Sequence, residues 1–434
     1  MNMTDIYEIA EYTLGALKAC GADDAQCTVV RSKKDELNVD GGKFSLMRST
    51  FNTSISMKAL KGGKKGVMSI NQATEEAIDA AAAQCLAAAD SSVADSAEQI
   101  APFTAQAEYR TGVFEPDLDK LFDRIEEFLK QTKEEYPKII LEQLISDYEH
   151  SEKLYMNTNG TKLRYEHGEY SFNSMFSAHE GEKSSSFNGY FCALDSLDKP
   201  FMDAGMQRQL LEDSEKQIDT VSPEEKFVGK VIYSPDCFNE LLATALGNFA
   251  SDGVLIDGTS PWKNSLGTKV ASDKLTLRSV PTDSRTVVGQ RFTSDGYPAE
   301  DIDIIKDGVL NTFILSQYGA NKTGFPRSLN SGDNLEVLPG DTSLEDMIKG
   351  IDKGLIINRF SGGHPSTNGD FSGVAKNSFI IENGRIGSAV SETMISGNII
   401  DMLNNIVAIS KEQETDGMSF MPWAEFDGVT VSGK

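Results

Sequence analysis

Apolar side chains recur every three or four residues in four stretches of the first half of the chain. This spacing places them on one face of an α-helix. The pattern predicts helices over Thr4–Ala19, Thr74–Ala89, Pro116–Glu135 and Met202–Thr220. Gly21 and Pro137 follow the first and third of these as helix-ending residues, and Thr74 is an N-cap candidate for the second.

Between these helices the apolar positions alternate with polar ones, which is typical of β-strands. The expected strands are Ala25–Ser32, Glu36–Asp40, Ser54–Lys61, Lys65–Ile70, Lys138–Tyr148, Glu152–Asn157, Lys162–Ala178 and Lys183–Leu194. Gly62-Gly63 and Asn159-Gly160 are turn signals, so we expect antiparallel neighbours. The polar stretch Asp90–Ala107 is predicted to be a linker.

The clearest single pattern is VIYSPDCFNELLATALGNFASDG, over Val231–Gly253, which predicts a short strand running into a helix. Ser234 suits the N-cap and Pro235 the first helical position, where no N–H is needed. Gly253 is the expected C-terminal stop. The predicted core-facing stripe consists of Phe238, Leu241, Leu242, Ala245, Leu246 and Phe249.

The remainder of the second half reads as strands and loops with two short helices. Expected strands are Val270–Leu277, Asp301–Ile305, Gly308–Leu315, Leu355–Phe360, Ser378–Glu382 and Arg385–Val390, and the helices are Ser343–Lys353 and Ile399–Ile406. The fold class is therefore α+β, with helices and a mixed or antiparallel sheet first and a β-rich region second. We expect an N-terminal domain over 1–222, with subregions 1–90 and 108–222, and a C-terminal domain over 226–434.

The charge balance limits the partners. The chain has 41 Lys+Arg against 66 Asp+Glu, a formal net charge of −25, and such a surface repels nucleic-acid backbones. The basic segment Leu60–Gly66 is interpreted as a solvated hairpin. No signal-peptide pattern or apolar run of membrane-spanning length is present, and the five cysteines, expected to be buried thiols, form no C-x-x-C pair. These features predict a cytoplasmic protein without direct nucleic-acid or membrane partners.

Few residues suggest chemistry. His150, His167 and His179 lack a partner histidine at helical spacing, and the latter two fall on expected strands, where exposed polar positions are the ordinary interpretation. The Gly-rich segment 359–377 is predicted to be a loop whose exposed backbone N–H groups can bind an extended peptide or an anion. The candidate peptide-binding residues in it are His364, Asn368, Gly369, Asp370, Phe371 and Ser372. His364 with Asp370 is a candidate acid–base pair, although Gly, Asn and Asp in a purely structural turn explain the same composition.

The segment LLATALGN (241–248), the following DGTSPWKNSLGTKVAS and the blocks Ser294–Gly324 and Asn368–Leu403 resemble the TldD/PmbA family. Its members were once described as modulators of DNA gyrase and are now regarded as metallopeptidases. The catalytic branch carries roughly L-L-H-E-A-V-G-H, in which two histidines bind a divalent metal, zinc, and the glutamate is the base. In this chain those three positions hold Ala243, Thr244 and Asn248, and no cysteine follows Cys237 to match the family's further ligand.

The resemblance therefore implies a PmbA/TldE-like branch without metal or other cofactor. It implies a non-catalytic partner or scaffold that dimerises through the C-terminal half, with a TldD-like catalytic subunit or with itself. The metallopeptidase complex to which it would belong acts on peptides or unfolded proteins. Two alternatives stay open: a hydrolase that uses another constellation within 359–377, and a protein-binding regulator related to DNA gyrase.

Overall fold

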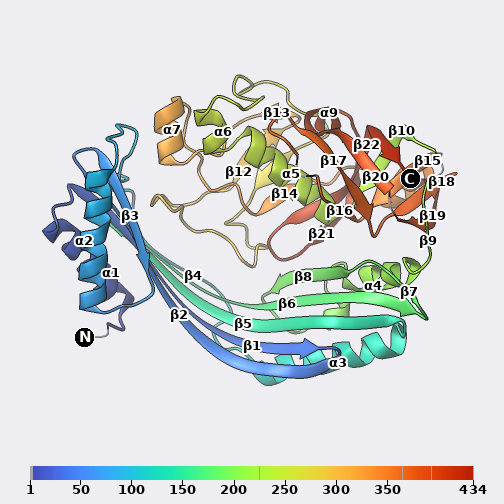
Figure 1. Ribbon diagram of the computed structural model, residues 1–434, viewed down its shortest axis with the longest axis horizontal. Helices are drawn as coiled ribbons and strands as arrows, with labels where there is room; N and C mark the ends of the chain where they lie inside the picture. The colour runs from blue at the N-terminus through green and yellow to red at the C-terminus, as the bar shows by residue number, and fades with distance from the viewer. Residues whose placement is uncertain (1–2, 224, 364, 392, 434) are drawn as a thin grey trace.

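The computed structural model describes residues 3–223, 225–363, 365–391 and 393–433. Helices and strands are segregated around two sheets, as the predicted α+β class requires. In Figure 1 the long strands of the first sheet curve beneath the second half of the chain, with α1 and α2 at one end of the arc.

The first sheet has the strand order β3-β2-β1-β5-β6-β4, and β7 and β8 also pair with β6. Its strands are β1 (Asp24–Asp40), β2 (Lys43–Lys61), β3 (Lys64–Ile70), β4 (Gln106–Gly112), β5 (Ile139–Asn157), β6 (Lys162–Glu180), β7 (Lys183–Ser184) and β8 (Asn188–Leu194). Only the β4–β6 pair is parallel; the others are antiparallel, as the turn signals predicted.

Two predicted breaks within these strands are wrong. Segments 25–32 and 36–40 form the single strand β1, and 138–148 and 152–157 form the single strand β5. The charged residues that suggested a break are paired across the sheet, where Lys34 Nζ lies 3.3 Å from Asp147 and 3.1 Å from Glu149. Opposite charges on neighbouring strands stabilise their pairing, so each strand continues through residues that do not alternate between apolar and polar.

The helices of the first half are α1 (Ile6–Ala19), α2 (Glu75–Ser91), α3 (Leu118–Glu135) and α4 (Gln207–Lys216). Thr74 caps α2 as predicted, because its hydroxyl accepts the Ala77 N–H.

The helix predicted over 202–220 is much shorter, since Gly205 takes a positive φ of 43° between a 3-10 turn at Phe201–Asp203 and α4. The stretch 92–105 carries no helix or strand, and Glu98 within it is buried beside Lys58 and Lys65.

The second sheet follows the order β13-β12-β11-β14-β22-β10-β15-β18-β19-β9, with β16, β17, β20 and β21 attached to it. Its strands are β9 (Thr220–Val221), β10 (Phe227–Tyr233), β11 (Leu277–Ser279), β12 (Ile302–Lys306), β13 (Val309–Leu310), β14 (Leu335–Val337), β15 (Lys353–Ile357), β16 (Arg359–Ser361), β17 (Asp370–Lys376), β18 (Phe379–Glu382), β19 (Arg385–Val390), β20 (Thr393–Asn398), β21 (Ile406–Thr415) and β22 (Phe420–Ser432). Its helices are α5 (Pro235–Phe249), α6 (Asp252–Ile256), α7 (Gln317–Thr323), α8 (Leu344–Lys349) and α9 (Ile399–Asn404).

Several predictions for this half need correction. The strand expected over 270–277 is wrong, since β11 begins only at its last residue, and the strand expected over 308–315 shrinks to β13. Most of the residues concerned bond to loops instead of to a ladder. Gly253 does not end the helix: α5 stops at Phe249, and Gly253 lies inside α6. Among the cysteines only four are buried, since Cys20 at the end of α1 is exposed; all five are free thiols.

One apolar core joins the two sheets. It combines Phe128 of α3 and Phe172 of β6 with Ile356 of β15, Phe379 of β18 and Trp423 of β22. The ring of Phe172 lies edge-on to Phe128 at 5.1 Å and 4.5 Å from Phe201. Because this core belongs to both sheets, burial of apolar surface fixes their relative position.

We predict that Phe172→Ala lowers the free energy of unfolding by about 3–5 kcal/mol, because it leaves a cavity under two aromatic rings. Phe191→Ala is the matched control on neighbouring β8, where the side chain is 41% exposed, and should cost less than about 1 kcal/mol. Calorimetric unfolding of both variants checks this, and equal losses would contradict the shared core.

Candidate functional site

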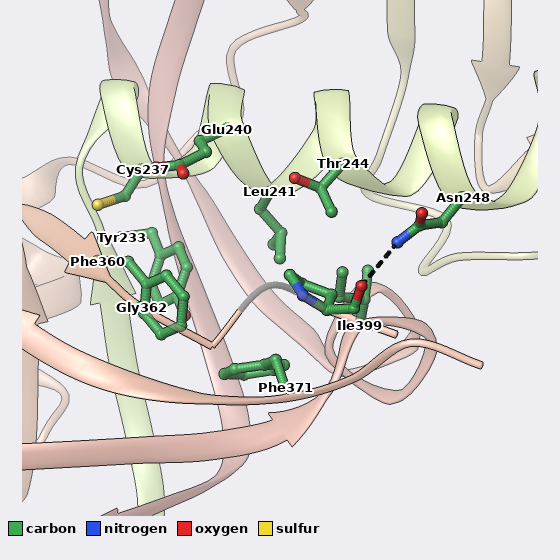
Figure 2. A pocket seen from close by; sticks show the side chains of 11 residues that line it. Tyr233, Cys237, Glu240, Leu241, Thr244, Asn248, Phe360, Gly362, Phe371 and Ile399 are labelled. Carbon is green, nitrogen blue, oxygen red and sulfur yellow. Dashed lines mark hydrogen bonds between the residues drawn. The ribbon is translucent and has the colours of Figure 1, made fainter. Parts of the chain in front are cut away.

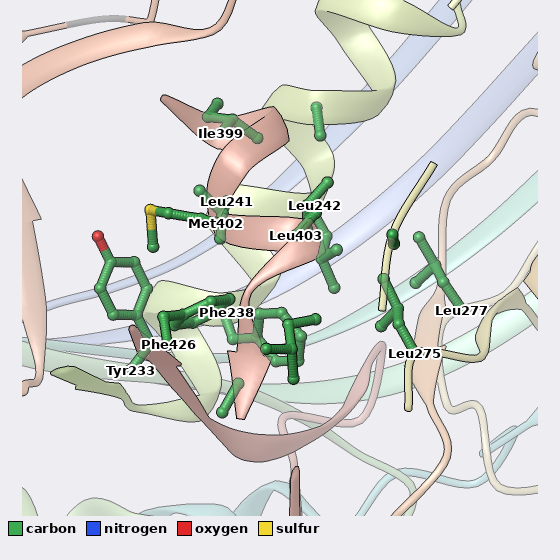
Figure 3. Close-up of a cluster of buried hydrophobic side chains, with 14 of the residues drawn as sticks. Tyr233, Phe238, Leu241, Leu242, Leu275, Leu277, Ile399, Met402, Leu403 and Phe426 are labelled. Carbon is green, nitrogen blue, oxygen red and sulfur yellow. The ribbon is translucent and has the colours of Figure 1, made fainter. Parts of the chain in front are cut away.

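Helix α5 is the element that the candidate site is built on. It follows β10 directly, with Ser234 at the N-cap position and Pro235 in the first turn, as predicted. The Ser234 hydroxyl does not cap the helix; it donates to the Asn358 carbonyl at 3.3 Å and so ties the helix start to the end of β15. The whole predicted stripe is buried in one core, shown in part in Figure 3: Phe238, Leu241, Leu242, Ala245, Leu246 and Phe249.

The outward face of α5 borders a pocket of about 240 Å³. From the helix it is lined by Cys237, Glu240, Leu241, Thr244 and Asn248, which share one face by their spacing. Opposite them lie Tyr233, Phe360, Gly362, Pro365, Phe371 and Ile399 (Figure 2). The pocket therefore has an apolar, aromatic floor and a polar rim supplied by the helix.

The three helix positions singled out by sequence differ in orientation. Thr244 and Asn248 line the pocket, whereas Ala243 is exposed and is not among the lining residues. The Asn248 amide Nδ2 donates to the carbonyls of Pro365 at 3.3 Å and Ser366 at 3.5 Å. Asn248 thus joins α5 to the segment that lies across the pocket from it, a contact drawn in Figure 2.

The predicted loop 359–377 is mostly a hairpin. Residues 359–361 form β16 and 370–376 form β17, which pairs with β16 on one side and β20 on the other. Sequence reasoning missed these strands because Gly and Ser, which disfavour strands in isolation, are held by ladders on both sides of β17. Of the proposed peptide-binding residues, Phe371 lines the pocket, while Ser372 is exposed on the alternate position of the strand. His364 lies outside the described residues.

Asn368, Gly369 and Asp370 form the turn that leads into β17. The Asp370 carboxylate accepts the side-chain amides of Asn368 at 2.8 Å and Asn398 at 2.9 Å. These bonds, with Asn398 first, hold the pKa of the Asp370 carboxyl below its usual value. Gly369 has φ +92°, and a Cβ there would lie 3.1 Å from the Asn398 amide and 3.2 Å from the Phe249 ring. The turn thus has a clear structural role.

The residues at the pocket do not fit a zinc ion. A zinc site needs three or four thiolate, imidazole or carboxylate ligands. Burial raises the pKa of the Cys237 thiol to about 12, which disfavours the thiolate, and Asn248 directs its N–H groups to carbonyls. Within the described ranges, no three His, Cys, Asp or Glu side chains come together as a metal site would require.

A second hollow of about 380 Å³ continues along α5 and shares Cys237 and Glu240 with the first. One wall is formed by residues of β6 and β8 and by Phe187, which precedes β8. The other wall is formed by Asp236 on α5 and by Asn358 and Arg359. Sequence reasoning gave no sign of it, since its two walls come from positions roughly 50 to 190 residues apart.

His167 was expected on an exposed strand position, and this prediction is wrong: it is only 3% exposed. Its Nδ1 lies 2.8 Å from the Thr111 hydroxyl, which also contacts the Tyr165 hydroxyl at 2.8 Å, and its Nε2 lies 3.1 Å from Glu169. The i, i+2 spacing of His167 and Glu169 on one strand face was the available signal. None of the four residues lines either hollow along α5, so we assign this network to β4–β6 pairing.

The structure is thus an α+β fold of two sheets with a pocket lined by one helix. Residues 227–433 match the model of the PmbA/TldA metallopeptidase C-terminal domain, and residues 26–89 match that of PmbA/TldA metallopeptidase domain 1. The chain belongs to the PmbA/TldD family, as the sequence motifs indicated.

Individual relatives agree with this assignment. The metalloprotease PmbA of Escherichia coli O157:H7 is 33% identical over 188 residues, which are 43% of this chain and 41% of the relative. The match thus spans less than half of that relative's length. TldE from Thermococcus kodakarensis has the same fold, with a TM-score of 0.83 and 20% identity over 98% of this chain and 100% of the other. A Bacteroides thetaiotaomicron protein described as a proposed modulator of DNA gyrase matches equally, with a TM-score of 0.83, 23% identity and full coverage of both chains.

None of the helices in the described part of the chain is long and apolar enough to span a membrane.

We predict that Asn248→Ala speeds amide hydrogen exchange in residues 366–373 by roughly fivefold, since one net hydrogen bond is worth about 1 kcal/mol. Asn239→Ala, on the same helix but away from the pocket lining, is the control and should leave that segment unchanged. Exchange followed by mass spectrometry decides it. Unaltered exchange in Asn248→Ala would show that this contact does not hold the segment on α5.

Proposed function

We propose that this chain is a metal-free, non-catalytic subunit of a PmbA/TldD-type metallopeptidase complex, in which it acts as partner or scaffold and contributes a binding surface for peptides or unfolded proteins. One observation carries the proposal. At the helix positions that hold the metal ligands and base in the catalytic branch stand a methyl group, a hydroxyl and an amide. The amide of Asn248 is used to bind backbone carbonyls.

The pocket supports the binding part of this proposal. Its floor of Tyr233, Phe360 and Phe371 and its rim of Thr244 and Asn248 combine apolar surface with a few polar groups, as ligand pockets generally do. Among the described residues, no hydrogen bond joins the Cys237 thiol or the Thr244 hydroxyl of this lining to the Glu240 carboxylate, and burial raises the pKa of the thiol to about 12. Binding without cleavage is the activity that such a lining supports best.

The partner in this proposal is a TldD-like chain with the H-E-x-x-x-H motif, and self-association through the C-terminal half is the second possibility. The acidic balance of the chain favours protein and peptide partners in a cytoplasmic setting over nucleic acid. Two alternatives remain hypotheses: a hydrolase based on 359–377, and a regulator directed at DNA gyrase. The engagement of Asp370 by two asparagine amides weighs against the first.

We predict that the purified chain carries less than roughly 0.1 zinc per molecule after dialysis, because a tight site needs preformed, deprotonated ligands. A TldD-like protein with the intact motif, purified in parallel, is the control and should retain close to one. Elemental analysis provides the measurement. Stoichiometric zinc in this chain would refute the metal-free assignment.

We further predict that cleavage of an unfolded protein requires the TldD-like subunit. The chain alone should show no turnover, and the mixture should be active and elute as one complex with the mass of a dimer or larger by light scattering. Replacing the motif glutamate of the TldD-like subunit should abolish activity, whereas Asp370→Asn in this chain should preserve it. Turnover by this chain alone in the presence of a chelator would favour the hydrolase alternative.

A further inference from the structure

The two hollows along α5 form one groove with distinct chemistry at its two ends. Cys237 and Glu240 line both of them, so the two hollows adjoin along the helix. The first end is closed by the Phe360 and Phe371 rings, which meet edge to face at 5.8 Å. With Leu241 and Ile399 these rings offer an apolar site for one large side chain.

The second end combines apolar walls with acidic groups. Met175 and Phe187, 42% and 55% exposed, present apolar surface to the hollow. Asp236 and Glu240 stand one turn apart on α5 and both line it. Within the described part of the chain, neither carboxylate forms an ion pair or a side-chain hydrogen bond.

The Arg359 guanidinium also lines this end of the groove. Its Nη1 donates a hydrogen bond to the Phe187 carbonyl at 2.8 Å. The hollow is therefore lined by two carboxylates that have no ion-pair partner among the described residues, and by the Arg359 guanidinium, which is hydrogen-bonded to a backbone carbonyl. Apolar walls with acids at the edge match a lysine or arginine side chain, which buries its aliphatic stem and keeps its charged head beside carboxylates. The net charge of −25 attracts basic segments to the protein as a whole.

We propose that this groove binds an extended peptide segment in which an aromatic or large aliphatic side chain fills the first hollow and a lysine or arginine two residues away lies against Asp236 and Glu240. Side chains two residues apart in an extended chain point to the same side, about 7 Å from each other, so both reach adjoining hollows. This inference rests on the proposed peptide-binding function and assigns its specificity: unfolded segments that combine apolar and basic residues.

The test uses the full-length chain and three fluorescein-labelled decapeptides of Gly, Ser and Ala in fluorescence anisotropy. The first carries phenylalanine with lysine two residues further; in the second glutamate replaces the lysine; in the third alanine replaces the phenylalanine. We expect the first to bind at least about tenfold more tightly than either of the others.

Variants locate the site. Glu240→Gln should weaken binding of the lysine peptide about two- to fivefold, the range for one exposed charge pair. It should leave a peptide with glutamine at the lysine position unchanged. Leu241→Arg, which places a bulky cation at the apolar end, should abolish binding of the lysine peptide. Glu126→Gln on α3 removes the same charge away from the groove and is the matched control.

The outcomes separate this inference from the function beneath it. If all peptides bind with equal affinity, or if Glu240→Gln and Glu126→Gln behave alike, the assigned specificity is wrong while peptide binding stands. If no peptide binds at millimolar concentration, the peptide-binding part of the proposed function fails with it. Circular dichroism of each variant confirms that it is folded before its affinity is interpreted.

Discussion

Burial of the inner face of α5 is the constraint on which the site depends. Phe238, Leu242 and Phe249 are fully buried against the second sheet, and the Phe238 ring meets Phe426 of β22 at 5.7 Å. Each such side chain contributes roughly 1.5–3 kcal/mol when it leaves water. With its orientation set in this way, the helix must turn its other face towards the pocket, whatever residues that face carries.

This arrangement allows the residues on the outward face of the helix to change without loss of its packing. The residues that would carry the chemistry stand on the outward face or at its margin, where they contribute little to the core. Asn248 shows what replaces them. A metal ligand offers a lone pair to the pocket, whereas this amide offers N–H groups to the Pro365 and Ser366 carbonyls. In the proposed non-catalytic chain, this hydrogen bond between α5 and the facing segment takes the place of a metal bond.

The groove exists because the two sheets share a core. Its walls come from β6 and β8 on one side and from α5 and β16 on the other. The shared core of Phe172, Ile356 and Trp423 and the hydrogen bond from Arg359 to the Phe187 carbonyl hold these walls at a fixed distance. A substitution in that core would therefore change the width of the groove, although the substituted residue does not line it. The acids at the groove are held by a helix that is itself anchored in the core, so their spacing does not depend on the loops.

The sequence by itself determined the amphipathic helices, the antiparallel character of the first sheet and the strand–helix unit from Val231 to Phe249. In each of these the signal lies in residues a few positions apart, and burial enforces the same periodicity. The motifs also identified the family and the altered helix positions. Tertiary structure alone decided the rest. β17 is a strand because β16 and β20 pair with it. His167 is buried because β4 lies beside β6. Asn248 lines the pocket and Ala243 does not, because the two side chains point in different directions from the helix. These outcomes depend on contacts between residues far apart in the chain, and no local pattern of residues encodes them.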